Sequence, residues 1–149
     1  MKRKVHTWSV STTRAPAEAF AYLADVTRHS EWSPKPYRVE DLSGPVEKGA
    51  TFTSYGWIPG DGDHRNDVEV TEVDPPRRFA LRSIEKGQTF ENTFVVEPEG
   101  SGSRISRTID LPVPGGVVGA LFPVLFAVVV KPAVQKGMNL LGSRLDAGA

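Results

Sequence analysis

The spacing of hydrophobic and polar positions divides the chain into three parts, and the first part predicts one strand followed by two short helices. Residues 5–12 combine β-branched and aromatic side chains with small polar ones, which is typical of a half-buried strand. An amphipathic helix is predicted from Pro16 to Ala24, because proline opens it and apolar residues recur at helical spacing. A second helical turn is expected from Thr27 to Glu31, before prolines force an extended exit.

The central part has the short, regularly spaced turns that are typical of an antiparallel sheet. Turns rich in glycine and proline separate segments of β-branched and aromatic residues. Such short connections join antiparallel neighbours, because a parallel crossover needs about a dozen residues or more. Six strands are expected here, over residues 37–42, 51–58, 64–73, 79–85, 89–97 and 104–111. Together with the first strand they predict a seven-stranded antiparallel sheet.

The last part returns to helical spacing and predicts one long C-terminal helix. Apolar residues recur at steps of three and four over residues 118–145. Pro123 and Pro132 lie inside this pattern, and each removes a backbone hydrogen bond and crowds the preceding turn. We therefore expect a kink or a broken start in this helix.

An uncharged stretch within this last part raises the question of a membrane span. Residues 111–130 carry no charge, and that length is nominally sufficient to cross a bilayer. Prolines and glycines occupy its beginning, however, and the continuous apolar part, residues 117–130, rises only about 21 Å as a helix. We expect no membrane span, and three roles stay open for residues 117–130: burial against the sheet, a homodimer surface, or transient membrane contact.

Composition and charge narrow the class of protein. The length of 149 residues suits one domain, and the absence of cysteine excludes thiolate chemistry and disulfides. Lysine and arginine together number 18, as do aspartate and glutamate, so the net charge is zero. The chain therefore lacks the surplus of basic residues that is typical of a nucleic-acid binder. The basic start runs into no apolar leader, so we expect a cytoplasmic protein. The three histidines are far apart in sequence, so we expect no metal and no cofactor.

The order of elements predicts an α+β domain in which a curved sheet grips one helix, because this buries the apolar faces of both. At this point the chain resembles the START-like superfamily, often labelled SRPBCC, and within it the bacterial polyketide cyclase/dehydrase-like proteins. The resemblance spans residues 1–149 as a single domain. The segments that carry it are Ala15-Pro16-Ala17-Glu18 through Leu23-Ala24-Asp25-Val26, Glu31-Trp32-Ser33-Pro34, Lys48-Gly49-Ala50-Thr51-Phe52, Val73-Asp74-Pro75-Pro76-Arg77-Arg78-Phe79, Phe94-Val95-Val96-Glu97-Pro98, and Gly102-Ser103-Arg104-Ile105-Ser106.

The resemblance implies a helix-grip fold with a pocket between the sheet and the C-terminal helix. Members of the superfamily use this pocket to hold sterols, lipids, polyketides and other apolar small molecules. The matching segments mark turns, a helix start and core positions, so they transfer no catalytic residue, and the superfamily includes both enzymes and binders.

Strand alternation selects the candidate site residues. Asn92 shares a strand face with Phe94, and Arg107 shares one with Ile109, so both polar side chains are expected to point inward. His64 lies on the face of Val68 and is a candidate donor or base at the rim. The aromatic residues that could stack a flat ligand are Trp32, Tyr55, Trp57 and Phe79.

Structural roles remain open for each of these residues. Arg107 could pair with a buried acid such as Glu72 or Asp110 instead of a ligand. Asn92 could be a satisfied core amide, and His64 an exposed loop residue. The aromatic side chains could simply fill the core.

Three functions follow. The first is a carrier or sensor of an apolar small molecule, with Arg107 and Asn92 fixing its polar end. The second is a cyclase or dehydratase acting on a keto substrate, with Arg107 stabilising an enolate and His64 moving a proton. The third is an interaction module that docks through its apolar terminal helix on a partner protein, a second copy or a membrane surface.

Overall fold

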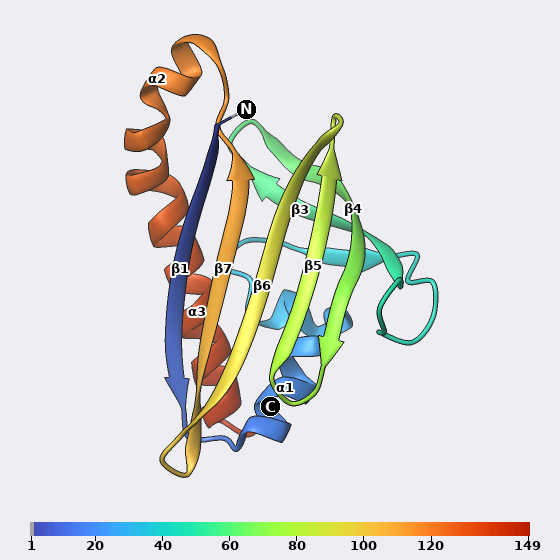
Figure 1. Cartoon of the computed structure of the whole chain (residues 1–149). Helices are drawn as coiled ribbons and strands as arrows, with labels where there is room; N and C mark the ends of the chain where they lie inside the picture. Colours follow the sequence, from blue (N-terminus) through green and yellow to red (C-terminus); the bar gives the residue numbers. More distant parts are fainter. Residues whose placement is uncertain (1) are drawn as a thin grey trace.

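The computed structural model describes residues 2–149 as a curved antiparallel sheet with a long helix along its inner face (Figure 1). The strands are β1 (Arg3–Thr12), β2 (Arg38–Glu40), β3 (Thr51–Ile58), β4 (Asp61–Asp74), β5 (Arg78–Glu85), β6 (Gln88–Glu99) and β7 (Gly102–Pro112). The helices are α1 (Pro16–Ala24), the 3-10 helix η1 (Val26–Glu31), α2 (Gly116–Leu125), the π-helical segment η2 (Phe126–Val130) and α3 (Lys131–Asp146). The predicted fold class is confirmed.

The strand order of the sheet is β1-β7-β6-β5-β4-β3-β2, with every pair antiparallel. Strands β2 to β7 follow one another as neighbours, as short turns require. The first strand instead pairs with the last along its whole length, from Arg3 opposite Pro112 to Thr12 opposite Ser103. Directly opposite residues share a face, so the pairing places Trp8, Arg107, Phe94 and Phe79 in one row across the inner face.

The core lies between this inner face and α3. Met138, Leu141 and Leu145 of α3 are fully buried, together with Phe79 and Phe94 of the sheet. The helix approaches β1 closely at a glycine, because a Cβ atom on Gly142 would lie 2.8 Å from Cγ2 of Val10. Burial of the apolar face of α3 therefore fixes the helix on one edge of the sheet.

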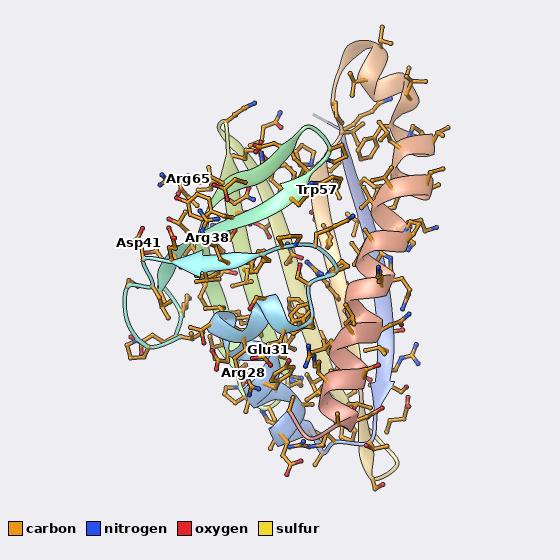
Figure 2. The ribbon with its side chains drawn as sticks, turned by 180° about the vertical axis from the view of Figure 1, so that it is seen from behind. Arg28, Glu31, Arg38, Asp41, Trp57 and Arg65 are labelled. Carbon is orange, nitrogen blue, oxygen red and sulfur yellow. The ribbon has the colours of Figure 1, made fainter. Side chains whose placement is uncertain are left out.

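The short helices are tied to α3 through Glu31. Its carboxylate accepts hydrogen bonds from Arg28, at 2.9 and 3.0 Å, and from the Tyr22 hydroxyl at 3.1 Å. Nε of Arg144 on α3 donates to the backbone oxygen of Glu31 at 3.1 Å. Figure 2 shows Arg28 and Glu31 on the short helices beside the long one. These contacts hold α1, η1 and α3 together at one end of the molecule.

The expected disruption of the C-terminal helix takes the form of a π-helical turn, and α2, η2 and α3 run on without a break. The backbone N–H of Lys131 donates to the oxygen of Phe126, five residues earlier, instead of the usual four. This turn lies between Pro123 and Pro132, each of which lacks the backbone N–H that an α-helix needs. The wider turn accommodates the prolines without ending the helix.

The two halves of the long helix have opposite surroundings. None of the ten residues of α2 is buried. Val117 of α2 is 79% exposed, and Val128 of η2 is 67% exposed. Phe126 is the buried residue of η2, whereas Phe122 and Val130 are half-buried. By length and composition Gly116–Asp146 could cross a membrane, yet its second half is anchored in the core. Most of residues 117–130 is therefore exposed and lies outside the core.

His29 is a polar side chain enclosed in this core. It is 6% exposed, and its Nε2 lies 2.7 Å from the backbone oxygen of Leu23. Its ring centroid lies 4.9 Å from that of Trp32. Burial lowers the pKa of His29 to about 4, so the ring is neutral at neutral pH and donates to Leu23.

Acidification should destabilise the protein through His29. The unfolded state takes up a proton near the usual histidine pKa, and the folded state does not. The contribution of His29 to the free energy of unfolding is therefore fully present above that pKa and is lost as the pH decreases towards about 4. The loss attributable to His29 is about 2 kcal/mol at about pH 5. Urea unfolding at neutral and acidic pH measures it, and His29→Gln should flatten the dependence.

His64→Gln is the matched control. The pKa of His64 is raised, chiefly by Glu85, so its contribution is present at acidic pH and is lost as pH rises through the folded-state pKa. The change His64→Gln should therefore make the loss of stability on acidification steeper. Equal slopes in His29→Gln and the parent protein would contradict the role given to His29.

Candidate functional site

Arg107 occupies the inner face of the sheet, as strand alternation predicts. It lies on β7 between Trp8 of β1 and Phe94 of β6. Its guanidinium carbon lies 5.3 Å from the centroid of the Phe94 ring and 6.0 Å from that of Trp32. The guanidinium is thus enclosed among aromatic rings, whose faces partly offset the loss of hydration.

No carboxylate neutralises Arg107 within residues 2–149. Of the two acids considered as partners, Glu72 pairs with Arg78 at 3.2 Å and Asp110 pairs with Arg3 at 2.7 Å. Burial lowers the pKa of Arg107 to about 10, which still leaves the group charged at neutral pH. The protein therefore keeps a cation in its interior without an anion, which is costly unless something else solvates it.

Asn92 provides the one hydrogen bond of this guanidinium within the described chain. Nε of Arg107 donates to Oδ1 of Asn92 at 2.9 Å, from the neighbouring strand β6. The terminal nitrogens Nη1 and Nη2 have no acceptor among residues 2–149, yet neither belongs to the fully buried unpaired atoms. They keep accessible surface although Arg107 lies deep in the protein, so the charge is not completely covered by protein atoms.

Trp32 adds a second unpaired donor to this region. Its side chain is 5% exposed. Among the side-chain nitrogen and oxygen atoms of residues 2–149, its Nε1 is the one that is fully buried and has no hydrogen-bond partner. Such an unsatisfied donor typically costs about 1–3 kcal/mol. Arg107 and Trp32 therefore both present N–H groups without protein acceptors near the same aromatic cluster.

Tyr37 is a neighbour of this site that sequence reasoning missed. It is half-buried, and burial raises the pKa of its hydroxyl, while the Ser54 hydroxyl and the charge of Arg107 oppose that rise. The residue precedes β2, which begins at Arg38, whereas the predicted strand begins at residue 37 and places Tyr37 on the same face as Val39. The available signal was this alternation, because the charged residues Arg38 and Glu40 take the opposite face of the predicted strand.

The structure places His64 away from Arg107, on β4. Its Nδ1 lies 3.2 Å from Asp61 and its Nε2 lies 3.0 Å from Glu85. The hydrogen bond to Glu85 is the main cause that raises the pKa of His64. Burial lowers this pKa by less, and Asp61 raises it further. These carboxylates favour the protonated ring, and no hydrogen bond joins it to Arg107 within residues 2–149.

Tyr55 and Trp57 lie outside the Arg107 cluster. The guanidinium of Arg38 stacks 3.9 Å from the centroid of the Tyr55 ring, on the strand face opposite to that of the buried Ser54. Trp57 is 43% exposed near the end of β3, with the Lys35 ammonium 4.6 Å from its ring centroid (Figure 2). Trp32 is therefore the ligand-stacking candidate that lies beside Arg107, and Phe79 is fully buried in the core.

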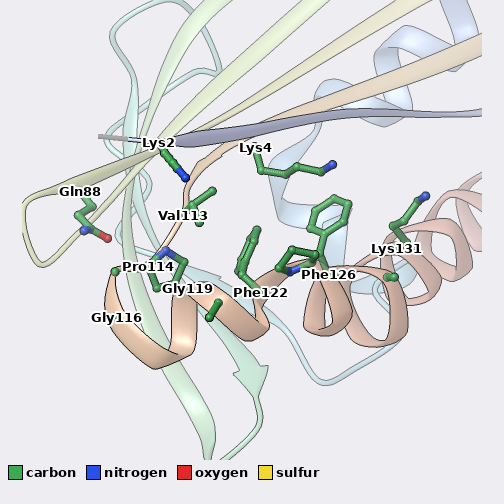
Figure 3. A pocket seen from close by; sticks show the side chains of 14 residues that line it. Lys2, Lys4, Gln88, Val113, Pro114, Gly116, Gly119, Phe122, Phe126 and Lys131 are labelled. Carbon is green, nitrogen blue, oxygen red and sulfur yellow. The ribbon is translucent and has the colours of Figure 1, made fainter.

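A cavity of about 890 Å³ lies between the sheet and the C-terminal helix, at the end where α2 begins (Figure 3). Its walls include Lys2 and Lys4 near the start of the chain and Phe122 and Phe126 of the helix. Arg107 does not line it. The centroid of the Phe126 ring lies 6.0 Å from that of Trp8, which is the direct neighbour of Arg107 on β1. Phe126 and Trp8 thus lie between this cavity and the enclosed charge.

The inner face between the charge and the cavity is apolar and incompletely covered. Ile109 and Leu111 follow Arg107 on the same face of β7, and Phe90 lies on the corresponding face of β6. All three keep part of their surface accessible, unlike the fully buried Phe94 and Ile105. The arrangement offers an apolar surface that ends in unpaired N–H donors, which suits a ligand with an acceptor oxygen at one end.

The comparisons with known proteins agree with this architecture. Residues 5–146 match the family described as polyketide cyclase / dehydrase and lipid transport. No curated protein sequence is significantly similar to the chain.

Solved structures share the fold at low sequence identity. TTHA0849 from Thermus thermophilus is 19% identical with a TM-score of 0.78, over 98% of this chain and 100% of that one. The Zhui aromatase/cyclase from Streptomyces sp. R1128 is 13% identical with a TM-score of 0.81, over 99% of each chain. Ara h 8.0201 is 13% identical with a TM-score of 0.68, over 99% of this chain and 100% of that one.

At these identities the solved structures establish the helix-grip fold and do not transfer an activity. The family match covers nearly the whole chain and agrees with the sheet, the long helix and the cavity between them. The chain belongs to the polyketide cyclase / dehydrase and lipid transport family.

Proposed function

We propose that this protein is a cytoplasmic carrier or sensor that binds an apolar small molecule between the sheet and the C-terminal helix, with Arg107 holding an acceptor oxygen of the ligand. The observation that carries the proposal is the buried guanidinium whose terminal nitrogens have no acceptor within residues 2–149. A carboxylate, phenolate or carbonyl oxygen would supply the missing partner. Asn92 fixes the orientation of Arg107 through Nε and leaves the other nitrogens for the ligand.

The apolar part of the ligand would provide most of the affinity. The cavity of about 890 Å³ has the size of pockets that hold drug-sized molecules. Burial of apolar surface contributes about 25 cal/mol per Å², so about 300 Å² corresponds to about 7 kcal/mol before the costs of association. We infer that Phe126 moves aside when a ligand reaches from the cavity to Arg107, because its ring lies beside Trp8.

Binding is better supported than catalysis at this site. An enolate-forming reaction needs a group that takes up a proton near Arg107. His64 is held by Asp61 and Glu85 instead, and burial raises the pKa of Tyr37, which keeps its hydroxyl protonated. The neighbouring His29 donates its ring N–H to Leu23 inside the core. The unpaired terminal nitrogens of Arg107 support a role as an anchor for a ligand oxygen.

We expect the protein to retain cargo during gentle purification. Native mass spectrometry should detect a discrete added mass that disappears after organic extraction of the same sample. Protein that is empty before extraction, and whose melting temperature no fatty acid, sterol or aromatic polyketide changes after it, would contradict the proposed function.

Arg107 should discriminate between ligands by charge. The change Arg107→Gln should weaken binding of anilinonaphthalene sulfonate, an anionic aromatic probe, by roughly tenfold or more, because it removes a charged hydrogen-bond donor. Binding of phenyl-naphthylamine, its uncharged analogue, should change less than about twofold. Fluorescence titration measures both probes. Arg104→Gln, on the outer face of the same strand, is the matched control, and equal losses for both probes would argue against an anchoring role.

Arg107 should also limit the stability of the empty protein. The change Arg107→Met removes a buried charge that has no carboxylate partner. The free energy of unfolding should therefore either rise, or fall by less than about 1 kcal/mol. Urea denaturation of ligand-free protein measures the difference. A loss of about 3 kcal/mol or more would identify Arg107 as a structural residue, since breaking an essential buried pair has that effect.

A further inference from the structure

The cavity beside α2 has a lining whose charges are all positive. Lys2, Lys4 and Lys131 are its charged side chains, and no aspartate or glutamate of residues 2–149 lines it. Apart from Gln88, the other residues of the lining are apolar, glycine or proline. Acidic residues are as numerous as lysine and arginine in the whole chain, so this excess of positive charge is local.

Two of these lysines come together from distant parts of the chain. Lys4 lies on the same face of β1 as Trp8, because alternate residues of a strand share a face. Nε1 of Trp8 donates to the backbone oxygen of Lys131 at 3.2 Å, which fixes the end of the π-helical turn against β1. In Figure 3 the side chain of Lys4 extends over the Phe126 ring, and Lys131 rises from the helix beside it.

These lysines have no carboxylate partner in the described chain. Its ion pairs are made by arginines and one histidine, and none includes a lysine of the cavity. Residues 111–145 contain no aspartate or glutamate, and Asp110 already pairs with an arginine at 2.7 Å. The Lys4 ammonium instead lies 5.0 Å from the centroid of the Phe126 ring. The amines are therefore available to an anion that enters the cavity.

His6 shows that the charges of two lysines act on one place. It lies between Lys4 and Trp8 on the inner face of β1, with its ring centroid 4.5 Å from that of Trp8 and 5.7 Å from that of Phe126. Burial lowers the pKa of His6, and the charges of Lys131 and Lys4 lower it further. The ring is therefore neutral at neutral pH, beside two cations and an apolar wall.

We propose that Lys4 and Lys131 bind the phosphate group of an amphiphilic phosphate monoester. Lys2 adds a third positive charge to the lining, and the apolar part of the ligand lies against Phe122 and Phe126. A phosphate monoester carries a charge of about −1.5 to −2 at pH 7, so it neutralises more than one lysine, whereas a carboxylate neutralises only one. Lysine binds phosphate as a point charge and needs no planar geometry.

This phosphate subsite is separate from Arg107. The rings of Phe126 and Trp8 lie between the two, with their centroids 6.0 Å apart. A single ligand that reaches both would carry a phosphate at one end and an acceptor oxygen at the other. That extension rests on the proposed function, whereas phosphate binding by the lysines does not require Arg107.

Calorimetric titration of cargo-free protein with decyl phosphate tests the subsite. Inorganic phosphate and decanol should each bind at least roughly tenfold more weakly, because the first lacks the apolar chain and the second lacks the charge. The double change Lys4→Gln and Lys131→Gln should weaken decyl phosphate binding by roughly tenfold or more, and decanol binding by less than about twofold. Lys48→Gln with Lys136→Gln is the matched control, because it changes the net charge equally at exposed residues outside the cavity lining.

His6 provides a second measurement at the same place. Bound phosphate neutralises Lys4 and Lys131, so saturation with decyl phosphate should raise the pKa of His6. An NMR titration of the histidine rings measures this pKa, and the signal that is absent from His6→Gln identifies the ring. His29 and His64 are the internal controls, and their pKa values should not change.

Several outcomes would overturn the phosphate proposal. Inorganic phosphate that binds as tightly as decyl phosphate would indicate a site for the free ion alone. Equal losses in the two double variants would assign binding to the overall charge, and an unchanged His6 pKa at saturation would place the phosphate elsewhere. Arg107→Gln should change decyl phosphate binding by less than about twofold, because this ligand has no oxygen at its apolar end. The proposed function and the phosphate subsite can therefore fail independently.

Discussion

The unpaired positive charge of Arg107 is the constraint on which the interior depends. A guanidinium between Trp8 and Phe94 cannot be packed as a hydrophobic side chain, and no carboxylate of the described chain reaches it. The aromatic faces and Asn92 compensate part of the lost hydration. The rest requires space for water or for a ligand oxygen, so the sheet cannot close completely on the helix at this position.

The long helix meets two opposite requirements with one continuous backbone. Its second half supplies Met138 and Leu141 to the core and approaches β1 closely at Gly142. Its first half exposes large aliphatic side chains, which an isolated soluble domain has no reason to display together. The cavity lies where the helix leaves the core, so the exposed half of the helix forms its wall.

Turn signals and the spacing of apolar residues predicted most of the fold, and strand alternation predicted the direction of the central pair of the candidate site. Arg107 and Asn92 were placed on inward faces because every second residue of a strand shares a face, and the hydrogen bond between them agrees with that placement. The pairing of β1 with β7 has no local signal. His29 was missed because it lies on η1, outside the strands, and its position depends on how η1 packs. Tyr37 lies at the start of the predicted strand 37–42, where alternation places it on the face of Val39, but no candidate was taken from that strand. Tyr55 has the side-chain type of a stacking residue, but alternation directs it outward.

The π-helical turn between Pro123 and Pro132 separates the mechanics of the two halves of the helix. Its backbone hydrogen bonds span five residues instead of four, and both flanking prolines lack a donor, so bending costs less here than elsewhere along the helix. A change of angle at this turn would alter the width of the cavity, because α2 forms one of its walls, while the contacts of Met138 and Leu145 with the core stay intact. The shape of the cavity and the packing of the core can therefore vary independently.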